Sequence, residues 1–182
     1  MTAQTILPAN TLSSGFDVAN SLRFNDGSSD SLTRTTETPT NADKFTFSAW
    51  VKMSAVGTDS TIISQYTDGN NRSEFGFISN GKLRWEFLLS GNNIATFETN
   101  RLFRDPSAWY HFVLAYDSTD GTAGDRFKLY VNGVRETSFS TETQPSQNYD
   151  MEWNKNGQTI EIGKYLFQSG YSQFDGSMTH FH

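Results

Sequence analysis

Short segments in which apolar and polar residues alternate fill the chain from residue 21 onward. Residues 45–52 and 83–89 show this alternation most clearly. A period of two places every second side chain on the same face of a strand, so that one face meets a core and the other meets solvent. Further strands are predicted at residues 61–67, 73–79, 93–99, 109–117, 126–136 and 159–165.

Turn-forming pairs that end in glycine separate these segments. The clearest is Asn80-Gly81, which lies between two alternating runs and predicts a tight hairpin. No stretch has helical periodicity over the length of a helix, and parallel strands need long crossover connections that are usually helical. The pattern therefore predicts an all-β fold, an antiparallel β-sandwich of the jelly-roll kind, with a barrel as the other closure that the strands allow.

The first twenty residues differ from the rest of the chain. Residues 1–20 carry isolated apolar side chains without helical or strand periodicity. They are predicted to be an extended N-terminal arm, which either moves freely or docks onto a neighbour. Residues 21–182 are predicted to be one sandwich domain. The start of the chain also lacks the basic and apolar regions of a secretory signal, and no apolar run is long enough to span a bilayer.

The amino-acid composition supports a β-sheet fold and disfavours several kinds of binding site. Aromatic residues make up 14% of the 182 residues and charged residues only 19%, which is typical of a β-sheet protein. The 14 basic and 20 acidic residues give a net charge of −6, which disfavours binding to a nucleic-acid backbone. The absence of cysteine excludes disulfides and thiolate metal sites.

Six segments taken together resemble a known family. They are SLRFNDGSSDSLTRT, FTFSAWVKM, RDPSAWYHFVLAYDST, RFKLYVNGV, IEIGK and FDGSMTHFH. Over residues 21–182 the chain resembles the laminin-G-like domains of the concanavalin A-like lectin/glucanase class, as found in virion proteins of tailed bacteriophages. In relatives the last segment continues into further apolar residues, whereas this sequence stops at His182, so a partner or a tail is expected to cover that edge of the sheet.

The resemblance implies a function as well as a fold. It implies a virion structural protein, as a tail fibre, spike or head-decoration subunit, made in the host cytoplasm and displayed at the virion surface for attachment to the host. It also implies a homo-oligomer, with a trimer favoured, in which residues 1–20 contact other virion proteins. The alternative is a stand-alone glycan-binding module with no virion role.

An enzymatic function is not expected. Glycoside hydrolysis needs two carboxyl groups flanking the scissile bond, and the spacing Glu-x-Asp-x-x-Glu of related β-glucan hydrolases does not occur. The strand acids Glu74, Glu86, Glu98 and Glu161 lie on separate segments and are predicted to face solvent. A pocket that holds two carboxylates within the separations used by glycosidases would revive the enzymatic hypothesis. His111 lies in the most apolar strand and is predicted to be a hydrogen-bonded residue of the sandwich rather than a base or a ligand.

The longest stretch without strand alternation is residues 143–158. Long loops often carry recognition residues, since aromatic faces stack on sugar rings and amides bond to hydroxyls. Tyr149, Trp153, Asn154 and Asn156 are therefore candidates for contact with a host-surface glycan. The alternative is that Trp153 covers the open end of the sandwich.

Calcium is the one cofactor that the sequence suggests. Asp117, Asp120 and Asp125 crowd into one loop and offer the oxygen ligands that a hard cation prefers. Asp26 and Asp30 form a second, smaller set. In both loops the alternative is a solvated turn, in which Asp and Gly are present because they favour the backbone conformation of a turn. His180 and His182 lie two residues apart and could also hold a metal.

Overall fold

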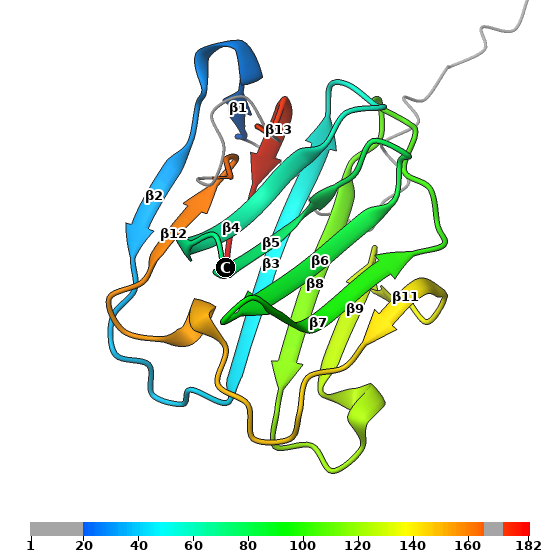
Figure 1. Ribbon diagram of the computed structural model, residues 1–182. Helices are drawn as coiled ribbons and strands as arrows, with labels where there is room; N and C mark the ends of the chain where they lie inside the picture. Colours follow the sequence, from blue (N-terminus) through cyan, green and yellow to red (C-terminus); the bar gives the residue numbers. More distant parts are fainter. Residues whose placement is uncertain (1–19, 166–172) are drawn as a thin grey trace, which may run out of the picture.

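The protein folds into two antiparallel β-sheets packed face to face. A computed structural model describes residues 20–165 and 173–182, and Figure 1 shows the course of the strands. The strands are β1 (Leu22–Phe24), β2 (Leu32–Thr35), β3 (Lys44–Met53), β4 (Ser60–Asp68), β5 (Asn71–Phe77), β6 (Leu83–Leu89), β7 (Asn92–Thr99), β8 (Tyr110–Asp117), β9 (Phe127–Val131), β10 (Val134–Arg135), β11 (Phe139–Thr143), β12 (Thr159–Ile162) and β13 (Gly176–Thr179). Three short 3-10 turns lie between them: η2 (Asp26–Ser28), η3 (Ala123–Asp125) and η4 (Glu152–Asn154).

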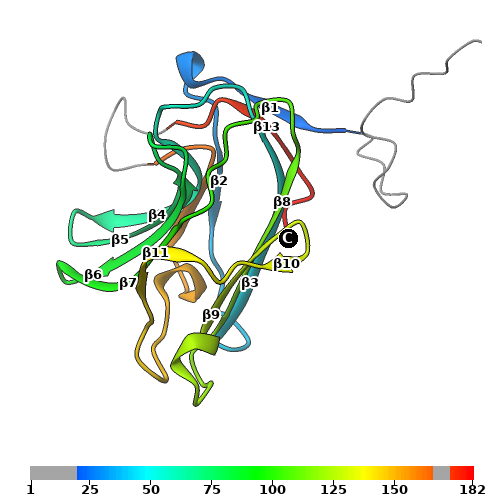
Figure 2. The same cartoon turned by 90° about the vertical axis from the view of Figure 1, so that its right-hand side faces the viewer.

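The strands divide into a six-stranded and a seven-stranded sheet. The six-stranded sheet has the order β1-β13-β3-β8-β9-β10, and the seven-stranded sheet has the order β11-β7-β6-β5-β4-β12-β2. Figure 2 shows the two sheets as separate layers. The predicted antiparallel sandwich is confirmed. Within the described residues, no helix is long and apolar enough to cross a membrane.

Aromatic side chains from the two inner faces fill the space between the sheets. Trp85 on β6 stacks on Phe127 on β9 with their ring centroids 4.2 Å apart, and Phe75 on β5 meets Phe112 on β8 edge to face. Such pairs add about 0.5–1.5 kcal/mol each to the free energy gained from burying the rings. The alternation in residues 45–52 and 83–89 therefore marks the inner face correctly.

The Asn80-Gly81 pair forms the predicted turn between β5 and β6. The Gly81 backbone N–H donates to the Ile78 carbonyl at 2.8 Å, and Gly81 has a φ of +86°, which favours glycine. The segment predicted at 126–136 is split into β9 and β10 by the Asn132-Gly133 turn. The segment predicted at 159–165 ends early because Gly163, at φ +84°, turns the chain away from the sheet.

Four strands, β1, β2, β11 and β13, were not among the predicted segments, and one boundary is not tested. β2 and β11 are edge strands of the seven-stranded sheet whose residues are mostly exposed, so they lack a clear alternation. Residues 1–19 lie outside the described residues. The division into an arm and a domain therefore stays a prediction.

Candidate functional site

A row of polar side chains crosses the outer face of the seven-stranded sheet. Strand register places one residue from each of six neighbouring strands in this row. In order from β2 to β7 they are Thr33, Glu161, Ser64, Glu74, Glu86 and Thr96. Directly opposed residues on neighbouring strands lie about 4.5–5.5 Å apart, so three carboxylates that are distant in sequence share one surface.

Basic side chains from the flanking rows pair with these carboxylates. The Arg84 guanidinium forms an ion pair with Glu74, and Arg72 lies 3.9 Å from Glu86. In the row beyond, Lys82 Nζ lies 2.8 Å from Glu98 Oε1, and Ser140 also donates to that oxygen. The ion pairs hold the side chains in fixed orientations, which prepares a surface to bind a polar ligand without further ordering.

The centre of this row is not exposed to solvent, contrary to the sequence prediction. Glu74 is only 8% exposed and Glu161 only 6%. The chain turns onto this face after β12, where the Ser64 hydroxyl donates to the Lys164 carbonyl at 2.7 Å and the next residue, Tyr165, is itself buried. The prediction that these strand acids face solvent is therefore wrong for Glu74 and Glu161.

Burial raises the pKa values of three side chains on this face, Glu74, Glu161 and Tyr165. Removal from water raises the pKa of Glu74 above its ordinary value, and the nearby Arg84 guanidinium opposes the rise. Burial also raises the pKa of the Tyr165 phenol, and the neighbouring Glu74 carboxylate adds to the rise. The pKa of Glu161 is raised by burial as well, while Lys164 opposes it.

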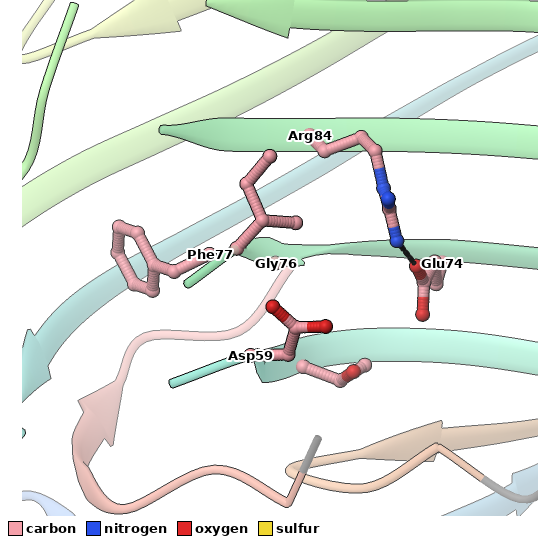
Figure 3. Close-up of a pocket in the computed structure, with 7 residues that line it drawn as sticks. Asp59, Glu74, Gly76, Phe77 and Arg84 are labelled. Carbon is pink, nitrogen blue, oxygen red and sulfur yellow. Dashed lines mark hydrogen bonds and ion pairs between the residues drawn. The ribbon is translucent and has the colours of Figure 1, made fainter. Parts of the chain in front are cut away.

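A small pocket opens beside Glu74 where β5 carries no side chain. Figure 3 shows Asp59, Glu74 and Arg84 around Gly76, with the ion pair from Arg84 to Glu74 at one side. A Cβ at Gly76 would overlap the backbone of β4, so only glycine fits here. The pocket has a volume of about 10 Å³. This volume is close to the minimum that holds one water molecule, and a hydroxyl group is of similar size.

The donors and acceptors of the pocket are only partly satisfied within the described residues. The Asp59 Oδ1 atom accepts from the Ser79 backbone N–H at 2.7 Å. The Arg84 Nε–H is buried and has no hydrogen-bond partner among the described residues. Buried donors are nearly always paired with protein, water or ligand, so this N–H is available to a further partner.

Two carboxylates in one pocket raise the question of hydrolysis. A retaining or inverting glycosidase holds a sugar between two carboxyl groups that are about 5–9.5 Å apart. The pocket between Asp59 and Glu74 has room for a single water-sized group, and Glu74 is already bound to Arg84. The space between these two carboxylates is therefore about the size of one hydroxyl group.

The predicted glycan-contact residues lie elsewhere. Trp153 is 6% exposed and packs between the sheets against Phe45 and Trp85, so it covers the end of the core and offers no exposed stacking face. Tyr149 is half-buried against Phe87. Asn156 is exposed, and the side chain of Asn154 lies outside the described part of the structure. Trp153 and Asn156 therefore do not lie on one accessible surface.

The predicted calcium ligands are occupied by protein partners. Asp117 binds Lys44 at 2.8 Å and accepts from Thr119, which together lower its pKa. Asp125 binds Arg135 at 2.8 Å, and Asp120 accepts from the Thr122 backbone. In residues 20–165 and 173–182 no three His, Asp or Glu side chains gather in a way that fits a metal ion. Asp26, Asp30, His180 and His182 belong to no such group either, and calcium binding stays a prediction.

His111 has the structural role that the sequence predicted. Its Nε2 atom lies 3.2 Å from the Ser48 hydroxyl, and its ring stacks on Trp50 with centroids 4.9 Å apart. Burial lowers the pKa of the imidazole, which favours its neutral form. These contacts belong to the outer face of the six-stranded sheet.

A family model now places this fold among known proteins. The model of the concanavalin A-like lectin/glucanases superfamily matches residues 13–182. The chain belongs to this superfamily. A search of curated proteins found no significant match.

Three solved structures show how widely this superfamily fold is shared. A putative carbohydrate binding protein from Bacteroides ovatus ATCC 8483 is 19% identical, with a TM-score of 0.58, over 88% of this chain and 42% of its own. The CBM40 domain of a Ruminococcus gnavus sialidase, bound to alpha2,3 sialyllactose, is 15% identical, with a TM-score of 0.54, over 82% and 89%. Tailspike protein 2 of the Escherichia coli O157:H7 bacteriophage CAB120 is 14% identical, with a TM-score of 0.58, over 88% and 22%. At these identities the similarity concerns the fold.

In this superfamily member, sequence reasoning missed the pocket. Asp59 and Arg84 were not singled out, because no spacing rule connects a loop before one strand with the middle of another. The pairing of the strands places the pocket residues side by side. Thr61, Gly76 and Arg84 lie opposite one another on the outer face of β4, β5 and β6. A glycine at the centre of an otherwise regular strand is the feature that would have pointed to it.

Proposed function

We propose that this domain binds carbohydrate through the outer face of the seven-stranded sheet, without catalysing a reaction. The observation that carries the proposal is the hydroxyl-sized pocket above Gly76, which is bounded by two carboxylates and a guanidinium. A sugar hydroxyl is both a donor and an acceptor. It can donate to Asp59 or Glu74 and accept from Arg84, and hydrogen bonds to charged groups are about twice as strong as neutral ones.

The surroundings of the pocket favour a ligand with several hydroxyl groups. The pairs Arg72–Glu86 and Lys82–Glu98 lie on neighbouring rows, and their side chains are about one fifth to one quarter exposed. They present more charged donors and acceptors in fixed positions. One hydroxyl group in the pocket would fix the ring, and adjacent hydroxyls would bond to these pairs.

The structural neighbours support this proposal. One bears the name of a putative carbohydrate binding protein, and another is a carbohydrate-binding module with sialyllactose bound. The absence of a pocket for a sugar between Asp59 and Glu74 favours binding without hydrolysis.

A glycan array followed by titration calorimetry tests the binding. Asp59→Asn keeps the Oδ1 acceptor for Ser79 but removes the charge, and Arg84→Lys keeps the charge but removes the planar fork of donors. We expect each change to weaken binding about tenfold or more, which is the usual cost of losing a charged hydrogen bond of about 1.5–3 kcal/mol. Asp117→Asn, in an exposed ion pair of the other sheet, is the control and should bind as the wild type does. No binding on a broad array, or equal binding by all variants, would refute the proposal.

We further propose that the domain is displayed on the surface of a bacteriophage particle and attaches it to host glycans, as part of a fibre, spike or decoration subunit. The six motif-bearing segments and the tailspike neighbour support this assignment. The purified chain should then bind whole host bacteria, and free ligand or Asp59→Asn should abolish that binding. A mass in solution that corresponds to a trimer would support the fibre arrangement, whereas a monomer with full glycan affinity would favour a stand-alone module.

A further inference from the structure

The charges around the small pocket on the seven-stranded sheet are not balanced. Arg84 lies among three carboxylates. Burial lowers the pKa of its guanidinium, but the carboxylates of Glu74, Glu86 and Asp59 outweigh that effect and raise the pKa above its ordinary value. Arg72 brings a second guanidinium, which lies 3.9 Å from Glu86. Among the described residues, three carboxylates beside the pocket therefore meet two guanidinium groups.

The excess negative charge belongs to Asp59. Its carboxylate lines the pocket (Figure 3) and accepts from the Ser79 backbone N–H at 2.7 Å. In residues 20–165 and 173–182 no basic side chain forms an ion pair with it. The remaining residues of the chain include no lysine, arginine or histidine, so they bring no further basic side chain to the pocket.

Arg84 cannot become the cationic partner of an acidic ligand without losing Glu74. The two side chains form an ion pair, and Glu74 is only 8% exposed. A buried carboxylate that loses its partner is strongly destabilising. The Arg84 Nε–H has no partner among the described residues and can still donate. A ligand carboxylate that accepted from it would lie close to Glu74 and Asp59, and like charges in such a position repel one another.

An uncharged hydroxyl group avoids this repulsion. It both donates and accepts, so it can donate to the Asp59 carboxylate and accept from the Arg84 Nε–H at the same time. A site discriminates between ligands through the repulsion of the wrong one as well as the attraction of the right one. The surplus carboxylate of the pocket is such a repulsive element.

We propose that this site selects uncharged sugars and rejects sugars with a carboxylate near the bound hydroxyl, and that Asp59 is the residue that determines this preference. The inference rests on the proposed function, since it concerns the same site. The fold alone does not imply it, because the CBM40 domain of the Ruminococcus gnavus sialidase has the acidic sugar alpha2,3 sialyllactose bound.

Titration calorimetry with matched pairs of sugars tests the preference. Oligomers of galactose, glucose and mannose are compared with oligomers of the corresponding uronic acids, in which a carboxylate replaces the hydroxymethyl group of each ring. At about 10 mM salt we expect the neutral member of a bound pair to bind at least about tenfold more tightly. The ratio should fall several-fold at about 1 M salt, because the screening length decreases from about 30 Å to about 3 Å.

Two variants with the same change in net charge locate the effect. Asp59→Asn keeps an oxygen that can accept from Ser79 but removes the charge, so the ratio of neutral to acidic affinity should fall at least about threefold. Asp117→Asn removes one charge from the other sheet and should keep the wild-type ratio. The salt series needs only the wild-type protein, so it tests the inference even where Asp59→Asn lowers the stability of the fold.

The outcomes separate this inference from the proposed function. Equal affinity for both members of the bound pairs, or tighter binding of the acidic member, would overturn the inference and leave carbohydrate binding in place. An equal fall of the ratio in Asp59→Asn and Asp117→Asn would assign the preference to the net charge of the chain, which overturns the role of Asp59. No binding of any member of any pair, and none on the glycan array, would overturn the proposed function and the inference with it.

Discussion

Replacing Arg84 by methionine tests the energetics of the candidate site directly. Arg84→Met keeps much of the side-chain length but leaves the buried Glu74 carboxylate without its cationic partner. Breaking a fully buried pair costs about 3–5 kcal/mol. Here 29% of the Arg84 side chain and 11% of the Glu74 side chain are exposed, so water screens part of the charge. We therefore expect a loss of about 2–3 kcal/mol in the free energy of unfolding at pH 8.

The loss of stability caused by Arg84→Met should be smaller at low pH than at high pH. Burial raises the pKa of Glu74 in the folded state, so the fold keeps the proton to a higher pH than the unfolded chain does. The stability that comes from the protonated carboxyl is fully present below the unfolded pKa and is lost as pH rises through the folded pKa. Removing Arg84 takes away the group that opposes the rise. The variant should therefore be much closer to the wild type at pH 5 than at pH 8.

Calorimetry and urea unfolding at pH 5 and pH 8 measure the free energy of unfolding that Arg84→Met loses. For a domain of this size, 1 kcal/mol corresponds to about 2–4 °C, so we expect Tm to fall by about 4–12 °C at pH 8. Lys44→Met breaks the exposed pair with Asp117 and is the control, with no measurable change expected. A variant as stable as the wild type at pH 8, or one with a larger loss at pH 5, would refute the reasoning.

Three further changes have expected outcomes. Trp153→Ala should cost about 3–5 kcal/mol in urea unfolding because it empties a buried aromatic site, and a loss under 1 kcal/mol would place the ring outside the core. Gly76→Ala should lower the free energy of unfolding by about 1–3 kcal/mol through overlap with β4, whereas Gly121→Ala, with open space around it, should not. Calcium or EDTA should leave Tm unchanged because the Asp117 and Asp125 carboxylates already bind cationic side chains. A rise of Tm with calcium would contradict that account.

The core strands could be predicted because their alternation reflects burial directly. Residues 83–89 place Leu83, Trp85 and Phe87 inside and the intervening residues outside, as the pattern indicated. Strands β2 and β11 could not be found in this way, because edge strands bury little and carry mostly polar residues. Their place depends on pairing with β12 and β7, which is a long-range property that no local window contains.

The site could not be predicted from local composition. The loop with Tyr149 and Trp153 looked suited to sugar binding, yet the need to cover the core drew Trp153 inward. The aspartates near residue 120 looked like calcium ligands, yet basic side chains from other strands reached Asp117 and Asp125. The acids that do come together, Glu74 and Glu86, are neighbours only because β5 and β6 form a hairpin of fixed register.

The pairing of β1 with β13 also has a mechanical consequence. The two strands run antiparallel through only three residue pairs, and Asn20 and Thr179 lie together at the same end of this ladder. Tension applied between these two points would act along the hydrogen bonds, which lie perpendicular to the strands, and would load them one pair at a time. A short ladder pulled in this direction opens stepwise like a zipper, so it yields at lower force than one sheared along its length. The edge at β1 would then extend under tension before the aromatic core between the sheets is disturbed.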